Sequence, residues 1–380
     1  MTVAPSVVIA AGGTGGHIFP GLALADEIAR RSPEARICFV GTPRGLEGSL
    51  IPERGYPLRL VDMRPLPRSF GLGPVRAGWS LLRATVQAGR ILRREGATVA
   101  VGMGGYASLP VVAAAWLRRI PRLVHESGAV PGLANRVAAR LTPNLALSFR
   151  DAGPSFPPRV RRRARVTGMP MDPAVARLDR QALRADARKA LDLPESVTAV
   201  LVLGGSLGAM RLNQVGVGLA GRWKDRTDVR LVIKAGKEHA DRVTAELDRM
   251  GATGVATAMA FLERMDHAYA AADVAVCRAG AGTVAELAAA GLPAVLVPYP
   301  HATGDHQTRN AGPLVRAGAA VAVPDADATA ERIGPILEEL AADPARRSSM
   351  SDAARSLGRP DAAEQLAAWV LDLSGGTEGL

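Results

Sequence analysis

The sequence predicts an α/β protein made of two doubly wound domains, each with a mostly parallel sheet. Three observations lead to this fold class. The chain has 380 residues, which is more than a single hydrophobic core usually supports. Short apolar runs alternate with longer amphipathic runs, as in consecutive βαβ units. This alternation stops near the middle of the chain and then begins again, so we expect two sheets.

The first half contains five apolar runs of strand length, with enough residues between them for crossover helices. They are residues 3–11, 35–42, 97–105, 122–127 and 144–150. The segment PGLALADEIARRS, residues 20–32, has helical spacing and begins with proline, which helices accept in their first turn. We therefore expect a first parallel sheet whose strands are joined by helices.

The second half repeats this order. Its strands are expected at residues 197–205, 229–236, 273–280 and 293–300, and residues 361–373 have the spacing of a final helix. Between the halves, residues 153–173 are rich in proline and arginine, which is typical of a linker. We therefore assign residues 1–165 to an N-terminal domain, 166–360 to a C-terminal domain, and 361–380 to a helix and tail expected to pack back on the N-terminal domain.

Charge is distributed unevenly along the chain. Residues 1–170 hold 24 arginines, no lysine and nine acidic residues, a net charge of +15, and the remaining residues sum to −4. Such asymmetry indicates that the N-terminal half meets a polyanion or an anionic membrane. The only two cysteines, Cys38 and Cys277, lie in apolar runs and are typical of buried thiols. No leader or membrane-spanning run is recognisable, so we expect a soluble cytoplasmic protein.

Four glycine-rich turns follow strand-like runs, two in each half. They are residues 12–17 (GGTGGH), 102–106 (GMGGY), 204–209 (GGSLGA) and 278–286 (RAGAGTVAE). Glycine lets the backbone approach a ligand closely, and the start of the next helix offers N–H groups to an anion. One such turn can serve only to tighten the fold, but four at strand ends favour ligand binding. None matches the phosphate loop of ATPases or the dinucleotide fingerprint, which argues against ATP hydrolysis and hydride transfer.

Six motifs in a fixed order resemble the MurG glycosyltransferases of the peptidoglycan pathway: GGTGGHIFPGLALA, GMGGYASLP, HESGAVPGLANR, GGSLGA, CRAGAGTVAELAAAGLPAVLVPYP and DHQTRNA. The resemblance implies the GT-B fold, with two facing Rossmann-like domains and an interdomain cleft. It also implies inverting transfer of N-acetylglucosamine from UDP-N-acetylglucosamine to the 4-hydroxyl of the N-acetylmuramyl unit of lipid I, which gives lipid II. No cofactor and no metal are implied, and no His/Cys cluster has metal-ligand spacing.

The resemblance assigns the donor site to the C-terminal half. It implies that the GGSLGA turn and residues 281–283 bind the diphosphate of UDP, and that residues 261–262 bind the uracil. It also implies that Glu286 binds the ribose hydroxyls and that residues 306–307 bind the transferred sugar. The implied donor-binding residues are Ser206, Leu207, Gly208, Phe261, Leu262, Ala281, Gly282, Thr283, Glu286, His306 and Gln307.

The resemblance assigns the acceptor site to the N-terminal half. The implied acceptor-binding residues are Thr14, Gly15, Gly16, Gly104, Gly105, Tyr106 and Asn135. His17 is the first candidate for the general base that takes the proton of the 4-hydroxyl, because an imidazole titrates near neutral pH. A histidine that only binds phosphate or caps the helix is the alternative. Glu126 is the second candidate, as the base or as the group that orients it.

The chain departs from the family pattern at two motifs. Family members commonly read His-Glu-Gln-Asn where Ser127 and Gly128 end the motif HESG, and Gly-Asn-Pro-Val-Arg where this chain reads GMPMD. Met169 replaces an amide, and Asp172 replaces an arginine expected near the donor phosphates, where a carboxylate would repel them. The alternatives are a paralogous GT-B transferase with another acceptor, a UDP-N-acetylglucosamine 2-epimerase, and a non-catalytic nucleotide-sugar-binding protein.

Residues 70–94 join apolar residues, among them Phe70, Trp79, Leu82 and Val86, to regularly spaced arginines. This pattern is typical of a helix that lies on an anionic membrane. A helix whose apolar face packs in the core is the alternative. With the lipid-linked acceptor that the resemblance implies, we expect a peripheral protein at the cytoplasmic face of the cell membrane. The basic run 158–166 lacks interleaved aromatic residues, so we expect no nucleic-acid partner.

Overall fold

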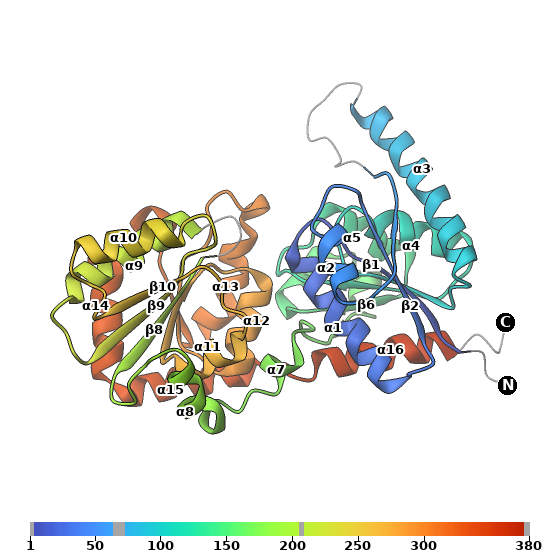
Figure 1. Cartoon of the computed structure of the whole chain (residues 1–380). Coiled ribbons are helices and arrows are strands. Elements are labelled where there is room, and N and C mark those ends of the chain that lie inside the picture. Colours follow the sequence, from blue (N-terminus) through green and yellow to red (C-terminus); the bar gives the residue numbers. More distant parts are fainter. Residues whose placement is uncertain (1–3, 64–72, 205–208, 376–380) are drawn as a thin grey trace. The chain divides into compact units, whose positions relative to one another are not determined.

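The computed structural model describes residues 4–63, 73–204 and 209–375 (Figure 1). The chain divides into two compact units. The first contains Met1–Asp172 and Pro360–Leu380, and the second contains Pro173–Arg359. Each unit is built around one parallel sheet with helices on both faces, so the α/β class and the two Rossmann-like sheets expected from the sequence are confirmed.

The sheet of the first unit has seven strands in the order β3-β2-β1-β4-β5-β6-β7. They are β1 (Ser6–Ala10), β2 (Arg36–Gly41), β3 (Leu58–Leu60), β4 (Val99–Gly102), β5 (Arg122–Glu126), β6 (Asn144–Leu147) and β7 (Arg165–Val166). The five strands predicted in this half are present, and β3 and β7 are short additions at the two edges. The strand order reverses between β1 and β4, which is where such sheets bind ligands.

Helices cover both faces of this sheet. They are α1 (Gly15–Arg31), α2 (Glu47–Glu53), α3 (Gly73–Arg94), α4 (Ser108–Leu117), α5 (Leu133–Ala138), α6 (Pro158–Arg161) and α16 (Ala362–Gly375), with short 3-10 turns at Ala139–Leu141 and Arg150–Ser155. The first helix begins five residues before Pro20, at the glycine turn itself. Alternate β1 residues such as Val7 and Ile9 pack with Leu24 and Ile28 of α1 in a fully buried core.

The last helix, α16, lies against α1 in the first unit (Figure 1). Leu366, Ala367 and Val370 are fully buried among the core residues of that unit. Trp369 is 8% exposed, and the guanidinium of Arg165 lies 4.3 Å from its ring centroid. The chain therefore returns to the first unit after completing the second.

The segment expected to be a linker, residues 153–173, is mostly part of the first unit. Its residues Arg165 and Val166 form β7 and pair with Ala146 and Leu147 of β6. The first unit therefore extends to Asp172, seven residues beyond the expected boundary. A two-residue strand between arginines and prolines has no recognisable period, and only its pairing with β6 identifies it.

The sheet of the second unit has six strands in the order β10-β9-β8-β11-β12-β13. They are β8 (Thr198–Leu203), β9 (Val229–Lys234), β10 (Ala256–Met259), β11 (Val274–Cys277), β12 (Ala294–Leu296) and β13 (Ala320–Ala322). The helices are α7 (Pro173–Ala176), α8 (Arg180–Ala190), α9 (Ala209–Trp223), α10 (Ala240–Arg249), α11 (Met265–Ala271), α12 (Ala281–Ala290), α13 (His306–Arg316), α14 (Ala330–Ala342) and α15 (Pro344–Leu357), with short turns at Thr303–Asp305 and Asp325–Asp327.

Candidate functional site

The first two glycine turns meet beyond the carboxyl ends of β1 and β4, which are neighbouring strands. Gly104 has φ +110° and Gly105 has φ +77°, a left-handed backbone that side chains disfavour. A Cβ on Gly105 would overlap the backbone of Gly12, and a Cβ on Gly104 would lie 2.5 Å from Cδ2 of His17. The two turns therefore touch directly, and this contact requires glycine at both positions of the second turn.

His17 lies in the first turn of α1, where its backbone N–H donates to the carbonyl of Thr14 (3.1 Å). Its side chain is half-buried, whereas Thr14 and Gly16 are exposed beside it. Tyr106 is 42% exposed at the second turn. The predicted acceptor residues of both turns thus lie along one edge of the first sheet, together with the predicted base.

A buried histidine to which the sequence analysis assigned no role, His125, lies close to His17. Its Nε2 donates to the carbonyl of Gly168 (3.1 Å) and lies 3.2 Å from Oγ of Ser148. Burial lowers the pKa of His125 to about 4, and the nearby charge of His17 acts in the same direction. His125 is therefore neutral at pH 7.

Glu126, the last residue of β5, is 5% exposed. Its Oε1 accepts a hydrogen bond from the backbone N–H of Gly128, and its Oε2 accepts one from Nδ2 of Asn135, both at 2.9 Å. Burial raises the pKa of Glu126 to about 7, although both hydrogen bonds favour the charged form. Asn135 also donates to the carbonyl of His125 (3.1 Å), so its amide nitrogen holds the end of β5 in place.

A second buried carboxylate, Glu47 in the first turn of α2, holds the first glycine turn from behind. Its Oε2 accepts the backbone N–H of Gly13 (2.9 Å), and its Oε1 accepts N–H and Oγ1 of Thr42 (both 2.8 Å). Burial disfavours the charged carboxylate, but these hydrogen bonds more than offset it, so the pKa of Glu47 lies below its ordinary value. A charged Glu47 therefore connects the turns that follow β1 and β2.

In the second unit, the predicted donor residues that the structure describes follow the carboxyl ends of β10, β11 and β12, which share one edge of the second sheet. Ser206, Leu207 and Gly208 lie outside the described residues. In the sequence they come after β8, the strand between β9 and β11. The remaining members of the set can be placed individually.

Phe261 follows β10 and is 56% exposed, whereas its neighbour Leu262 is 5% exposed. The ammonium group of Lys234, at the end of β9, lies 5.1 Å from the centroid of the Phe261 ring. Burial lowers the pKa of Lys234, and the carboxylate of Glu286 favours its charged form. The result is an exposed aromatic ring with a cation at its face, which suits stacking of a nucleobase.

Glu286 lies on α12, and its Oε2 accepts the hydroxyl of Tyr269 (2.7 Å). This hydrogen bond fixes the orientation of the carboxylate. Residues 281–283 form the first turn of α12, which begins after the extended residue Gly280. The N–H groups of a first helical turn have no partners within the helix and favour an anion.

Gln307 connects two turns of the second unit. Its Oε1 accepts the backbone N–H groups of Ala279 (3.1 Å) and Tyr299 (2.9 Å). The carbonyl oxygen is therefore committed to the protein, and only the Nε2 donor of Gln307 can serve a sugar hydroxyl. His306 precedes it as the first residue of α13 and is half-buried.

The residues that depart from the family pattern have structural roles of their own. Met169 is 2% exposed, and its sulfur lies 3.7 Å from Oγ of Ser148. Asp172 belongs to the first unit, and its carboxylate lies 4.0 Å from the guanidinium of Arg54. Gly128 supplies the N–H that Glu126 accepts, and Ser127 is 6% exposed.

Sequence reasoning missed four residues of these two edges: Glu47, His125, Lys234 and Tyr269. His125 lies inside a motif that was recognised, and Lys234 ends a predicted strand, so their positions alone could have suggested them. Glu47 and Tyr269 gave no such signal, because they lie outside the recognised motifs and hold Gly13 and Glu286, which are 34 and 17 residues away. Among the described residues, no group of three or more His, Cys, Asp or Glu side chains could hold a metal ion.

Comparison with known proteins matches both halves of the chain. The glycosyltransferase family 28 N-terminal domain matches residues 7–146, and the C-terminal domain of the same family matches residues 199–366. A protein of Saccharopolyspora erythraea named UDP-N-acetylglucosamine–N-acetylmuramyl-(pentapeptide) pyrophosphoryl-undecaprenol N-acetylglucosamine transferase is 43% identical over 372 residues, which cover 98% of this chain and 95% of that protein.

Solved structures show the same fold over the whole chain. Acinetobacter baumannii MurG is 30% identical, with a TM-score of 0.76, and the match covers 97% of this chain and 99% of that one. A UDP-N-acetylglucosamine 2-epimerase from Neisseria meningitidis also matches 97% of this chain and 100% of its own, with a TM-score of 0.67. At 12% identity, this second likeness concerns the fold alone.

Proposed function

The chain belongs to glycosyltransferase family 28 and within it to the MurG group, and from this premise we propose that it transfers N-acetylglucosamine from UDP-N-acetylglucosamine to the N-acetylmuramyl unit of lipid I, forming lipid II. Apart from membership of the family, the observation that best supports the proposal is the contact between the two glycine turns of the first unit. It leaves His17 half-buried beside exposed backbone, where an acceptor hydroxyl can reach it.

His17 is the general base in this proposal. It takes the proton of the acceptor 4-hydroxyl while that oxygen attacks the anomeric carbon of the sugar and the bond to UDP breaks. A single displacement of this kind inverts the anomeric configuration. Glu126 is the weaker candidate because it is 5% exposed and both of its oxygens already accept hydrogen bonds. It orients the end of β5 instead.

The leaving diphosphate is stabilised without a metal ion. The N–H groups of the first turn of α12 and the positive end of its dipole face the charge that develops on UDP. Phe261 stacks on the uracil, and Glu286, held by Tyr269, accepts the ribose hydroxyls. Nε2 of Gln307 donates to the transferred sugar, because its Oε1 is already engaged.

The enzyme acts at the membrane surface, and this is also part of the proposal. On α3, Trp79, Leu82 and Val86 are 64%, 55% and 47% exposed, whereas Ala84, Ala88 and Leu92 are buried on its core face. Phe70 lies outside the described residues. The described helices include none that is long and apolar enough to cross a bilayer. The exposed apolar residues and the arginines beside them support peripheral contact with the cytoplasmic leaflet.

The experiment that tests the function uses the purified full chain with UDP-N-acetylglucosamine, with and without a short-chain lipid I analogue, in the presence of a chelator. We expect UDP release that depends on the acceptor, and a product heavier by one N-acetylhexosamine. Donor binding without turnover would favour the paralogue with another acceptor. Appearance of a 2-epimer without acceptor would instead identify an epimerase.

A further inference from the structure

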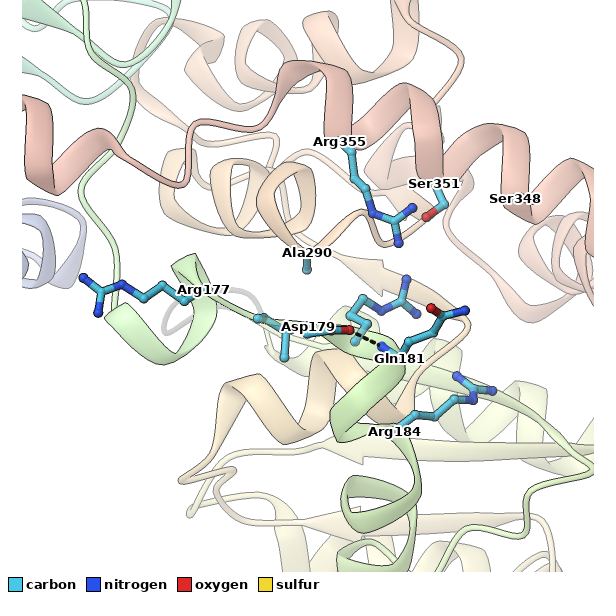
Figure 2. Close-up of a pocket in the computed structure, with 10 residues that line it drawn as sticks. Arg177, Asp179, Gln181, Arg184, Ala290, Ser348, Ser351 and Arg355 are labelled. Atoms are coloured by element: carbon cyan, nitrogen blue, oxygen red, sulfur yellow. Dashed lines mark hydrogen bonds between the residues drawn. The ribbon is translucent and has the colours of Figure 1, made fainter.

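A cavity of about 650 Å³ lies in the second unit, away from the glycine turns (Figure 2). It is lined by the segment 177–184, which starts α8, by Ala290 at the end of α12, and by three residues of α15, Ser348, Ser351 and Arg355. In a parallel sheet the end of a crossover helix lies near the amino ends of the strands. The cavity is therefore at the opposite edge of this sheet from the predicted donor residues.

Arginine dominates the lining. Arg177, Arg180, Arg184 and Arg355 are all lining residues, although the guanidinium of Arg177 is directed away from the other labelled side chains (Figure 2), and Asp179 is the only carboxylate among the lining residues. That carboxylate is already engaged, because its Oδ1 accepts the backbone N–H groups of Gln181 and Ala182 at the start of α8. Figure 2 shows Arg184 and Arg355 on elements that face each other across the cavity.

The fold holds Arg180 in place. Arg180 donates to the carbonyls of Tyr269 (3.0 Å) and Gly291 (2.8 Å) and to that of Ala272. Oγ of Ser351 also donates to the carbonyl of Gly291 (2.6 Å). Neutral carbonyls satisfy the N–H groups of Arg180 without cancelling its charge.

The acidic partners of Arg184 and Arg355 balance only part of the charge of these two side chains. The carboxylate of Asp273 forms ion pairs with both Arg184 (2.8 Å) and the fully buried Arg188 (2.7 Å), so one negative charge is shared by two guanidinium groups. Arg355 pairs with Asp352 only at the exposed surface (3.2 Å), where such a pair contributes little. Burial lowers the pKa of Arg180 to about 10, and the like charges of Arg184 and Arg355 act in the same direction. An anion in the cavity would relieve this repulsion.

We propose that this cavity is a second anion site, which binds a small molecule carrying two or more phosphate groups. Guanidinium groups suit phosphate oxygens because they can donate two parallel hydrogen bonds. The hydroxyl of Ser348 adds a donor on the α15 side. The site is recessed between helices, so a soluble oligophosphate fits it better than the headgroup of a lipid in a bilayer. This site is separate from the predicted donor site and does not depend on the proposed function.

The test is calorimetric titration of the full chain with inorganic pyrophosphate, in the presence of saturating UDP to block the predicted donor site. We expect binding to the wild type and about tenfold weaker binding to Arg355→Gln, which loses one charge-assisted donor. The side chain of Arg355 is 52% exposed, so this variant should fold normally. Arg184→Gln provides a second measurement. This variant should also fold, because Arg188 still pairs with Asp273. Arg242→Gln, which changes an exposed residue of α10 in the same unit, is the matched control and should bind like the wild type.

The outcomes separate the possible sources of the anion. Loss of pyrophosphate binding in Arg355→Gln but not in Arg242→Gln supports a soluble ligand. If only sedimentation with vesicles containing phosphatidylglycerol weakens in Arg355→Gln, the phosphate is that of a lipid. Equal pyrophosphate and vesicle binding by all variants, or pyrophosphate binding that saturating UDP abolishes, would overturn the site. Turnover of UDP-N-acetylglucosamine should be retained in Arg355→Gln, so the two proposals fail independently.

Discussion

At the scale of single residues, the position of His17 depends on the absence of a side chain opposite it. Its ring lies against Gly104, where even a methyl group would come within 2.5 Å of the ring. His125, in contrast, is completely buried and held by Gly168 and Ser148. Two imidazoles close to each other thus have different environments, and only the half-buried one is open to a substrate.

Replacement of His17 by alanine tests its role as the base. We expect turnover to fall by about 10²-fold or more, because positioned proton transfer typically contributes that much. Affinity for UDP-N-acetylglucosamine should remain near that of the wild type, since the predicted donor residues lie on the other unit. Steady-state kinetics and calorimetry measure the two quantities. His239→Ala, a half-buried histidine of the second unit, is the control, and turnover like that of the wild type in His17→Ala would remove His17 from the mechanism.

The raised pKa of Glu126 leads to a prediction about how the stability of the protein depends on pH. Its pKa is about 7 in the folded chain and 4.5 in an ordinary environment, so the folded state binds more protons between these values. This contribution to stability is complete below pH about 4.5 and disappears as the pH rises through 7. Glu126→Gln cannot lose that proton, so its free energy of unfolding relative to the wild type should rise across this window, by up to about 3 kcal/mol.

Urea unfolding at a series of pH values measures this difference. His125 titrates in both proteins, and its effect therefore cancels in the comparison. A constant difference between the two proteins from pH 4.5 to 7 would mean that Glu126 ionises normally. The same variant separates the two candidates for the base: if Glu126 only orients the end of β5, the rate of Glu126→Gln should keep the pH dependence of the wild type at a lower level.

At the scale of elements, α3 and α4 expose large apolar side chains that lie outside the hydrophobic core. They pack against each other in the first unit (Figure 1). Trp79 and Leu82 on α3 and Trp116 and Leu117 on α4 are between 49% and 66% exposed. Burying apolar side chains of this size in a bilayer interface is favourable, and arginines add attraction to anionic headgroups.

The double variant Trp79→Ala/Arg83→Ala tests this surface. We expect about tenfold weaker binding to anionic vesicles, because one interfacial aromatic ring and one charge are lost. Sedimentation of the protein with vesicles measures the binding. A matched control, Arg249→Ala/Met250→Ala, removes an exposed arginine and a partly exposed apolar residue from the second unit. If both double variants bind vesicles equally well, α3 does not contact the membrane.

At the scale of the whole molecule, the C-terminal helix ties the end of the chain to the unit in which the chain begins. Oγ of Ser374 lies 2.5 Å from Oγ1 of Thr98, which is 276 residues earlier in the chain. Trp369 packs beneath Arg165 at the edge of the core of the first unit. The stability of this unit therefore depends on residues synthesised after the complete second unit.

Replacement of Trp369 by alanine should lower the free energy of unfolding of the first unit by about 3 kcal/mol, because a large buried side chain leaves a cavity. Chemical denaturation followed by circular dichroism measures the loss. Trp116→Ala, which removes a tryptophan that is 49% exposed, is the control and should change stability by less than about 1 kcal/mol. An equally small effect of Trp369→Ala would show that α16 contributes little to the core.

Most of the fold could be predicted from the sequence, and so could the edges on which the candidate site residues lie. Nine strands, α1 and α16 follow from patterns of apolar residues, and the glycine turns at the strand ends predict where ligands would bind. The short strands β7 and β13, with two and three residues, are too brief to show a period. The expected boundary after residue 165 differed from Asp172 for the same reason.

The sequence by itself determined the strands, the glycine turns and the family, because each depends on residues close together in the chain or on motifs read in order. Only the tertiary structure decided that His125 bonds to Gly168, that Glu47 holds Gly13, and that four arginines line one cavity. These arrangements bring together residues that lie up to 178 positions apart in the chain. Strand order and helix packing bring them together, and no local pattern records which elements become neighbours.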